Sequence, residues 1–145
     1  GIKANLPDLL AALARSQLRR FDQMQQRRRA ILGAYRAALE PAGLRFVPEI
    51  EDPGSADHLA VVVLPEGVDR PTVVGGLQAR GINPSVHFRP LHQFSWFADN
   101  ASIGPGGLPT CDAMAERTLS LPLHVGLTDD DVARVCDAMT DLVAG

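Results

Sequence analysis

The stretch His58-Leu59-Ala60-Val61-Val62-Val63-Leu64 is the strongest indication of fold in the sequence. After the opening histidine it is a continuous apolar run, rich in valine. A loop with proline, glycine and acidic residues precedes it, and Pro65 follows it. A short apolar run between turn residues predicts a buried strand. We therefore expect a sheet built around residues 58–64.

Further strands are predicted on both sides of this run. Residues 44–47 precede it, and residues 82–88 and 120–123 follow it in the chain. A helix predicted over residues 70–80 lies between the strands at 58–64 and 82–88, and Gly81 ends that helix. The sheet is therefore expected to have three or four strands.

Helices are predicted before and after the strands. Pro7 and Asp8 begin a first helix, because proline is tolerated at a helix start and an acid there interacts favourably with the dipole. A longer helix is predicted over about 19–39, and Thr128 is expected to cap the last helix. The predicted inward-facing residues of these helices are Leu18, Phe21, Met24, Ile31, Tyr35, Leu39, Val73, Val74, Leu77, Val132, Val135, Met139 and Leu142.

The order of elements predicts an α+β fold. Two helices precede the strands, and helices then alternate with strands to the end of the chain. This order is typical of a small, mostly antiparallel sheet covered by helices. Residues 89–109 form a long irregular stretch before a short helix predicted over 111–119. A stretch of that length is usually functional or poorly ordered.

Composition narrows the classes of function. The chain has 145 residues, enough for one core, and it is 46% hydrophobic and 21% charged. Its net charge of −3 argues against a nucleic-acid-binding protein. No apolar run approaches the roughly 20 residues that cross a membrane, and no signal peptide is expected. Cys111 and Cys136 are isolated, which argues against a metal site and favours a reducing cytoplasm.

The first residues predict an anion-binding corner. Gly1, Lys3 and Asn5 alternate just ahead of the helix that starts near Pro7. Lysine supplies charge, asparagine supplies an amide, and a helix start offers free N–H groups. A simpler alternative is that Asn5 only caps the helix while Lys3 is solvated.

Histidines provide the other candidate site residues. His87 ends a predicted strand, and His92 lies in the loop beyond it. They could serve as a proton shuttle, hydrogen-bond a substrate or be ordinary loop residues. His58 begins the central predicted strand, where it could have either a structural role or a role in binding. His124 follows the last predicted strand.

Two other groups of residues have structural or binding interpretations. The basic residues of the long helix could bind phosphate, but a solvated helix face fits the acidic total better. They are Arg19, Arg20, Arg27, Arg28 and Arg29. The pair Trp96 and Phe97 is interpreted as a lid element or a contact between subunits.

Three segments resemble the carboxy-terminal part of the DegT/DnrJ/StrS-type sugar aminotransferases, which are fold type I enzymes dependent on pyridoxal 5'-phosphate. They are Gly1-Ile2-Lys3-Ala4-Asn5-Leu6-Pro7-Asp8, Val86-His87-Phe88-Arg89-Pro90-Leu91-His92 and Ser120-Leu121-Pro122-Leu123. The resemblance covers nearly the whole chain, and its motifs occur in the right order. With lysine at position 3 and asparagine at position 5, the first segment is most like that of the branch that acts on UDP-4-keto sugars.

The resemblance implies roles for the candidate residues. Lys3 and Asn5 would reach across a homodimer interface toward the neighbouring subunit's cofactor phosphate or nucleotide-sugar. His87 and Phe88 would face the sugar, and Arg89 would lie near the diphosphate, where its planar guanidinium suits bidentate contact. His92 matches a second family histidine, and a role near the nucleotide is possible for His58.

The resemblance also implies which domain is missing. The chain would be the carboxy-terminal small domain, with residues 1–40 leading into an α+β unit over 44–145. The larger amino-terminal domain, which holds the cofactor, is not in this sequence. Lys3 is the only lysine and does not match the lysine that forms a Schiff base with the cofactor. We therefore expect the chain to be inactive alone.

The implied activity of the parent protein is transfer of an amino group from glutamate to a nucleotide-linked 4-keto sugar. Such sugars belong to polysaccharide, lipid A or antibiotic biosynthesis. Because the chain starts at Gly1 and enters a motif at once, we expect an excised domain or fragment. The alternatives are a non-catalytic regulatory or interaction module, or one half of a split enzyme.

Overall fold

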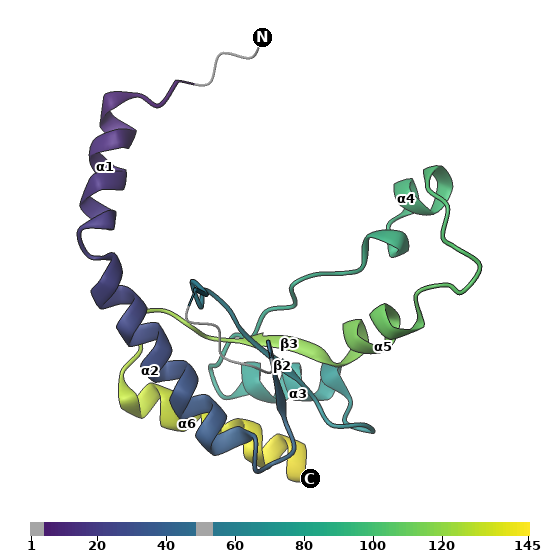
Figure 1. The fold of residues 1–145 in the computed structure, drawn as a ribbon. Coiled ribbons are helices and arrows are strands. Elements are labelled where there is room, and N and C mark those ends of the chain that lie inside the picture. Colours follow the sequence, from purple (N-terminus) through teal and green to yellow (C-terminus); the bar gives the residue numbers. More distant parts are fainter. Residues whose placement is uncertain (1–4, 49–53) are drawn as a thin grey trace.

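The computed structural model describes residues 5–48 and 54–145. The elements follow one another as α1 (Asp8–Leu18), α2 (Phe21–Leu39), β1 (Arg45–Val47), β2 (Ala60–Val63), α3 (Arg70–Ala79), η1 (Leu91–Gln93), α4 (Ser95–Asn100), α5 (Pro109–Arg117), β3 (Thr118–Leu121) and α6 (Asp129–Ala144). Figure 1 shows α1 and the α4–α5 region projecting from the same side of a central body that holds the sheet.

The sheet is antiparallel with the order β1-β2-β3, which confirms the predicted α+β class. The run that predicted a buried strand supplies the central strand, with Val62 opposite Phe46 of β1 and Leu119 of β3. The strand is shorter than predicted and starts at Ala60, so His58 precedes it. Successive side chains of a strand point to opposite faces. Val62 lies in the core, whereas Val61 is half-buried.

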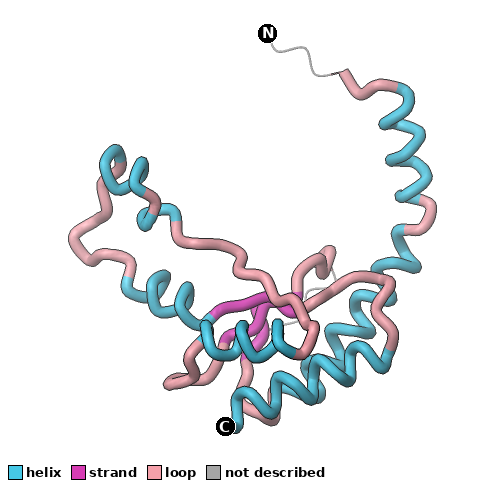
Figure 2. Tube along the Cα trace, turned by 180° about the vertical axis from the view of Figure 1, so that it is seen from behind, coloured by secondary structure: helices cyan, strands magenta, loops and turns pink. Residues whose placement is uncertain are grey.

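Helices α2, α3 and α6 lie on one side of the sheet in both views (Figures 1 and 2). They contribute Tyr35, Leu77 and Met139 to the core, all completely buried. The predicted inward faces of α3 and α6 are confirmed, although Val74 and Leu142 are only partly buried. Helix α6 begins with the predicted cap, because Thr128 and Asp131 form a reciprocal capping box.

The start of the chain is less buried than its sequence pattern predicted. Helix α1 contains no buried residue, and Leu18 and Phe21 of the predicted stripe are 71% and 42% exposed. The buried face of α2 begins only at Gln25. A periodic apolar pattern identifies a face that packs against something, but not whether the partner lies within the same chain.

Most of the basic residues on α2 are not simply solvated, contrary to prediction. Arg27 donates to Asp129 Oδ1 at 2.8 Å and to the carbonyl of Leu127 at 2.5 Å, which ties α2 to the start of α6. Arg29 donates to Asp57 at 3.1 Å. None of the described helices is long and apolar enough to cross a membrane.

Tyr35, the single tyrosine of the chain, makes stability depend on pH. Its hydroxyl donates to the carbonyl of Pro122 at 2.9 Å. Burial, with smaller contributions from Cys136 and Asp131, raises its pKa well above the ordinary value of about 10. Because the folded state therefore holds this proton more tightly than the unfolded state, its contribution to stability is complete below about pH 10 and is lost as pH rises further.

We expect the free energy of unfolding to fall above about pH 10 and Tyr35→Phe to reduce that fall. Urea unfolding at a series of pH values measures it. Burial also raises the pKa of the Cys136 thiol, so the comparison is made in a Cys136→Ala background, which removes this second alkaline contribution. An unchanged alkaline slope in Tyr35→Phe would contradict the expectation.

Two adjacent glycines of α3 provide a matched test of the α3–α6 contact. A Cβ atom on Gly75 meets no atom within 4 Å, whereas one on Gly76 runs into the Leu142 side chain of α6. Alanine is better than glycine in a helix by about 1 kcal/mol, and overpacking costs about 1–3 kcal/mol. We expect Gly75→Ala to be stabilising and Gly76→Ala to be less stable than it by about 1–3 kcal/mol. Equal unfolding free energies in urea would show that Leu142 moves without cost.

Candidate functional site

The segment that carries His87 leaves the sheet beside β3. Residues 82–88 were predicted to form a strand, but only Ser85 pairs, through two hydrogen bonds with Ser120 at N···O distances of 3.0 and 2.7 Å. Pro84 has no N–H to donate to a ladder, which explains why no strand extends through it. His87 therefore lies two residues beyond an isolated bridge.

The ring of His87 is held from the side of the sheet. Its Nδ1 lies 2.9 Å from Oγ of Ser120, a residue of β3 that is only 3% exposed. The Phe88 ring meets it edge to face, with centroids 4.9 Å apart. One ring nitrogen is thus engaged by the protein, and the hydrogen bond fixes the orientation of the imidazole.

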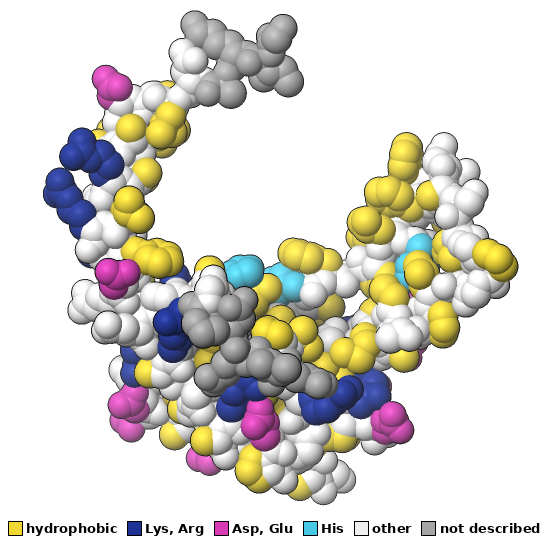
Figure 3. Space-filling view, viewed as in Figure 1, with side chains coloured by type: hydrophobic (Ala, Val, Ile, Leu, Met, Phe, Trp, Pro, Cys, Tyr) yellow, Lys and Arg dark blue, Asp and Glu magenta, His cyan; other side chains and the backbone are white. Residues whose placement is uncertain are grey.

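The next two residues form an open surface. Phe88 is 78% exposed, and Arg89 is also exposed, with its guanidinium 5.4 Å from the centre of the Phe94 ring. Figure 3 shows histidine and hydrophobic side chains between projecting α1 and the α4–α5 region. An aromatic ring beside a guanidinium suits a ligand with a flat or apolar part and an anionic part.

His92 lies in η1 and faces α5. Its Nε2 lies 2.7 Å from Oδ1 of Asp112, and Gln93 Nε2 donates to the same oxygen at 2.9 Å. These hydrogen bonds, that of Gln93 first, lower the pKa of the Asp112 carboxyl. They join the 91–93 turn to the first turn of α5. The stretch 89–109, predicted to be irregular, thus contains η1 and α4 and is tied to the next helix.

A cavity of about 560 Å³ adjoins this junction. Its walls are mainly apolar side chains of η1, α4 and the following loop, together with His92 and Cys111. Cys111 is exposed and Cys136 is buried, and both are free thiols. Trp96 is 63% exposed and meets Phe97 edge to face, with the ring centroids 5.1 Å apart.

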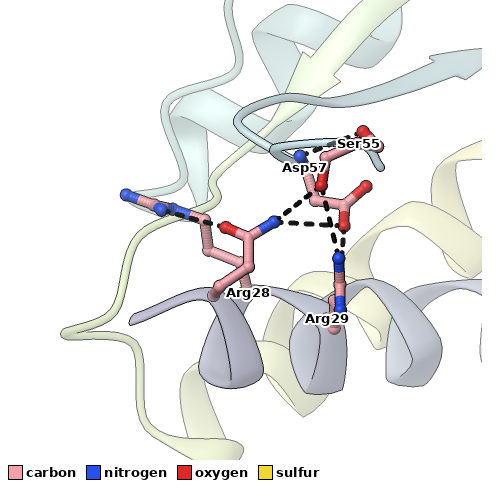
Figure 4. A network of polar contacts seen from close by, with 5 residues as sticks. Arg28, Arg29, Ser55 and Asp57 are labelled. Carbon is pink, nitrogen blue, oxygen red and sulfur yellow. Dashed lines mark hydrogen bonds and ion pairs between the residues drawn. The ribbon is translucent and has the colours of Figure 1, made fainter. Parts of the chain in front are cut away.

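His58 lies in different surroundings. It is exposed, borders a cavity of about 440 Å³ between α2 and the sheet, and shares no hydrogen bond or ring contact with His87 in the described structure. The turn before it is anchored to α2 (Figure 4): Gln25 Nε2 donates to the Ser55 carbonyl at 2.9 Å, and Arg29 donates to Asp57. Asp57 has a φ of 45°, which aspartate tolerates better than most residues.

The amino-terminal motif is described only in part. Lys3 and Gly1 lie outside the described residues. Asn5 is exposed, and α1 begins at Asp8 with Pro7 in the N-cap position and no side-chain capping bond. The simpler alternative, in which Asn5 caps this helix, is therefore wrong.

Sequence reasoning missed the two residues that hold the histidines. Ser120 was predicted only as part of the strand over residues 120–123, and Asp112 had no role. The signal for Ser120 was a hydroxyl between the apolar residues Leu119 and Leu121, since a buried hydroxyl needs a partner. No comparable signal existed for Asp112, because contact with His92 depends on how the chain between positions 92 and 112 folds.

The described residues do not form a complete cofactor site. They contain no lysine, so they offer no amine to hold pyridoxal phosphate covalently. Nor do three or more of their histidine, cysteine and acidic side chains gather into a group that could hold a metal ion.

Comparisons with known proteins agree with the fold. Spore coat polysaccharide biosynthesis protein SpsC of Bacillus subtilis is 37% identical over 150 residues, which cover 100% of this chain and 39% of SpsC. The aminotransferase TlmJ of Streptoalloteichus hindustanus is 32% identical with a TM-score of 0.85, over 99% of this chain and 38% of TlmJ. The PLP form of Spr1654 from Streptococcus pneumoniae, 24% identical, shares the fold with a TM-score of 0.88, over 99% of this chain and 37% of Spr1654.

The chain thus spans about two fifths of the length of these relatives. Residues 1–140 match the DegT/DnrJ/EryC1/StrS aminotransferase family, so the match includes the amino-terminal motif, the His87 segment and the sheet. The chain belongs to the DegT/DnrJ/EryC1/StrS aminotransferase family.

Proposed function

We propose that this chain is the carboxy-terminal domain of a pyridoxal-phosphate-dependent aminotransferase that moves an amino group from glutamate to a nucleotide-linked 4-keto sugar. The branch that acts on UDP-linked sugars is the one proposed. The observation that carries the proposal is the family match over residues 1–140. The name of SpsC, a polysaccharide biosynthesis protein, supports a sugar substrate.

His87, Phe88 and Arg89 are proposed to bind the nucleotide-sugar. They lie together at the end of the segment that passes beside β3 and leaves the sheet, and each has an exposed or half-exposed side chain. Phe88 offers a face for the sugar or base, and Arg89 offers paired donors for a diphosphate. His87 is oriented by Ser120 and has a second ring nitrogen available.

His92 and His58 are proposed for supporting roles in the same binding. His92 Nε2 is engaged by Asp112, so its contribution is to hold the loop between His87 and η1 or to act through Nδ1. His58 is exposed beside a separate cavity and would meet the nucleotide only if the ligand extends toward α2.

Asn5 and Lys3 are proposed to act on the neighbouring subunit of a homodimer. Helix α1 projects away from the sheet (Figure 1), and Asn5 precedes this helix in the chain, so Asn5 would be presented to another body. The exposed leucines of α1, among them Leu9 at 81%, provide apolar surface for such a contact. The motif would bind the cofactor phosphate or the nucleotide-sugar in trans.

The lysine that holds the cofactor is proposed to lie outside these 145 residues, because Lys3 does not match the family's covalent lysine. When bound, pyridoxal phosphate supplies the electron sink that lets an amino group move. This chain's residues bind and orient the sugar, and alone they are expected to be inactive. We place the intact enzyme in the cytoplasm.

Absorbance between roughly 330 and 430 nm tests the function of the intact protein, because the cofactor changes colour as it gains or loses the amine. Glutamate should convert the spectrum to the amine form, and a nucleotide-linked 4-keto sugar should restore it. If a sugar leaves the amine form unchanged, that sugar is not a substrate. If the intact protein never binds the cofactor, the proposal is wrong.

A further inference from the structure

Ser120 has one side-chain hydrogen bond in the described structure, and its partner is Nδ1 of His87. Its backbone N–H and carbonyl are both used in the bridge to Ser85, and its side chain is buried within β3. No buried side-chain nitrogen or oxygen among the described residues lacks a hydrogen-bond partner. The direction of the Ser120–His87 bond therefore determines how the hydroxyl proton is satisfied.

Two directions of this bond are chemically possible. If Nδ1–H of His87 donated, the hydroxyl of Ser120 would only accept, and its own proton would have no partner in a buried position. If the hydroxyl donates, its proton is satisfied and Nδ1 supplies the lone pair. An unpaired buried donor costs about 1–3 kcal/mol, so the second direction is favoured.

A neutral imidazole that accepts at one nitrogen carries its hydrogen on the other. We propose that Ser120 is a positioning residue that holds His87 as the neutral tautomer with hydrogen on Nε2, so that His87 presents an N–H donor to an acceptor oxygen of the sugar-nucleotide. A carbonyl, hydroxyl or phosphate oxygen fits such a donor. The identity of the ligand in this inference rests on the proposed function, whereas the tautomer of His87 does not.

The tautomer is measured without substrate. Nitrogen-15 histidine spectra of the intact protein should show the shift of a protonated nitrogen at Nε2 of His87 and of an unprotonated one at Nδ1. Ser120→Ala should move the signals toward a mixture of tautomers, and Ser120→Thr, which keeps the hydroxyl, should retain them. Ser85→Ala is the control, because Ser85 meets Ser120 through backbone atoms. A hydrogen on Nδ1 in the unmodified protein would overturn the inference.

The proposed contact between His87 and the nucleotide-sugar is tested by enzyme activity in two His87 variants that keep Ser120. The amide of glutamine reaches the position of Nε2, whereas that of asparagine reaches only Nδ1. His87→Gln should keep KM for the nucleotide-sugar within about threefold of the original, and His87→Asn should raise it about tenfold, the effect of losing one hydrogen bond. Equal KM values in the two variants would overturn the donor role.

The two measurements separate this inference from the proposed function. If the Nε2–H tautomer is found but no nucleotide-sugar reacts, the proposed substrate is wrong and the role of Ser120 stands. If the sugar reacts but hydrogen lies on Nδ1, the role of Ser120 is wrong and the function stands.

Discussion

Replacing Asn5 with alanine in the intact enzyme is expected to weaken binding of cofactor or nucleotide-sugar by about 1–3 kcal/mol, which is the usual effect of leaving a charged group without its hydrogen-bond partner. That range corresponds to a loss of affinity of about 5- to 150-fold. The effect is expected to be large because Asn5 makes no capping bond to α1, so its amide is available to another body.

The measurement is cofactor affinity by titration together with KM for the sugar. The free energy of unfolding should stay unchanged, because the exposed Asn5 side chain supports no element of this domain. Asn83→Ala is a matched control, since Asn83 is also an exposed asparagine. Unchanged affinity and KM with a loss of stability would make Asn5 a structural residue.

His87→Ala is the second substitution with a large expected effect. We expect KM for the nucleotide-sugar to rise by about 5- to 30-fold, the result of losing about 1–2 kcal/mol of hydrogen bonding. The half-reaction with glutamate should be nearly unchanged, because His87 is proposed to contact the sugar and not the cofactor. The change also leaves the Ser120 hydroxyl without its ring partner, so stability is measured alongside.

Single-turnover spectra follow each half-reaction separately. His124→Ala is the control, because His124 follows β3 and is exposed. Its hydrogen bond with the amide of Leu127 is made by the backbone carbonyl, which the substitution keeps. It should leave both half-reactions unaffected. Equal damage to both by His87→Ala would mean that His87 supports the fold or the cofactor site.

The main elements of the fold were predictable because their signals are local. The valine run gave β2, and Thr128 with the following aspartates gave the start of α6. Errors arose where tertiary contacts decide the structure. The strand predicted over 82–88 is a single bridge, since Pro84 removes a donor that the apolar pattern alone does not reveal.

The candidate site was predictable only in its outward-facing members. His87, Phe88 and Arg89 were identified from the resemblance to a family, and the structure places them on one open segment. Ser120, which holds His87, lies 33 positions from it along the chain, and Asp112, which holds His92, lies 20 positions from it. A single sequence does not show which residues will pair in this way, because the contacts arise only when β3 and α5 pack against the loop.

The most direct test of the account is borohydride reduction of the intact protein with its cofactor, followed by peptide mass analysis. Reduction attaches the cofactor permanently to the lysine that holds it. We predict one cofactor per subunit on a lysine outside these 145 residues, and none on Lys3. A stoichiometric adduct on Lys3, or no adduct on any lysine, would contradict the account.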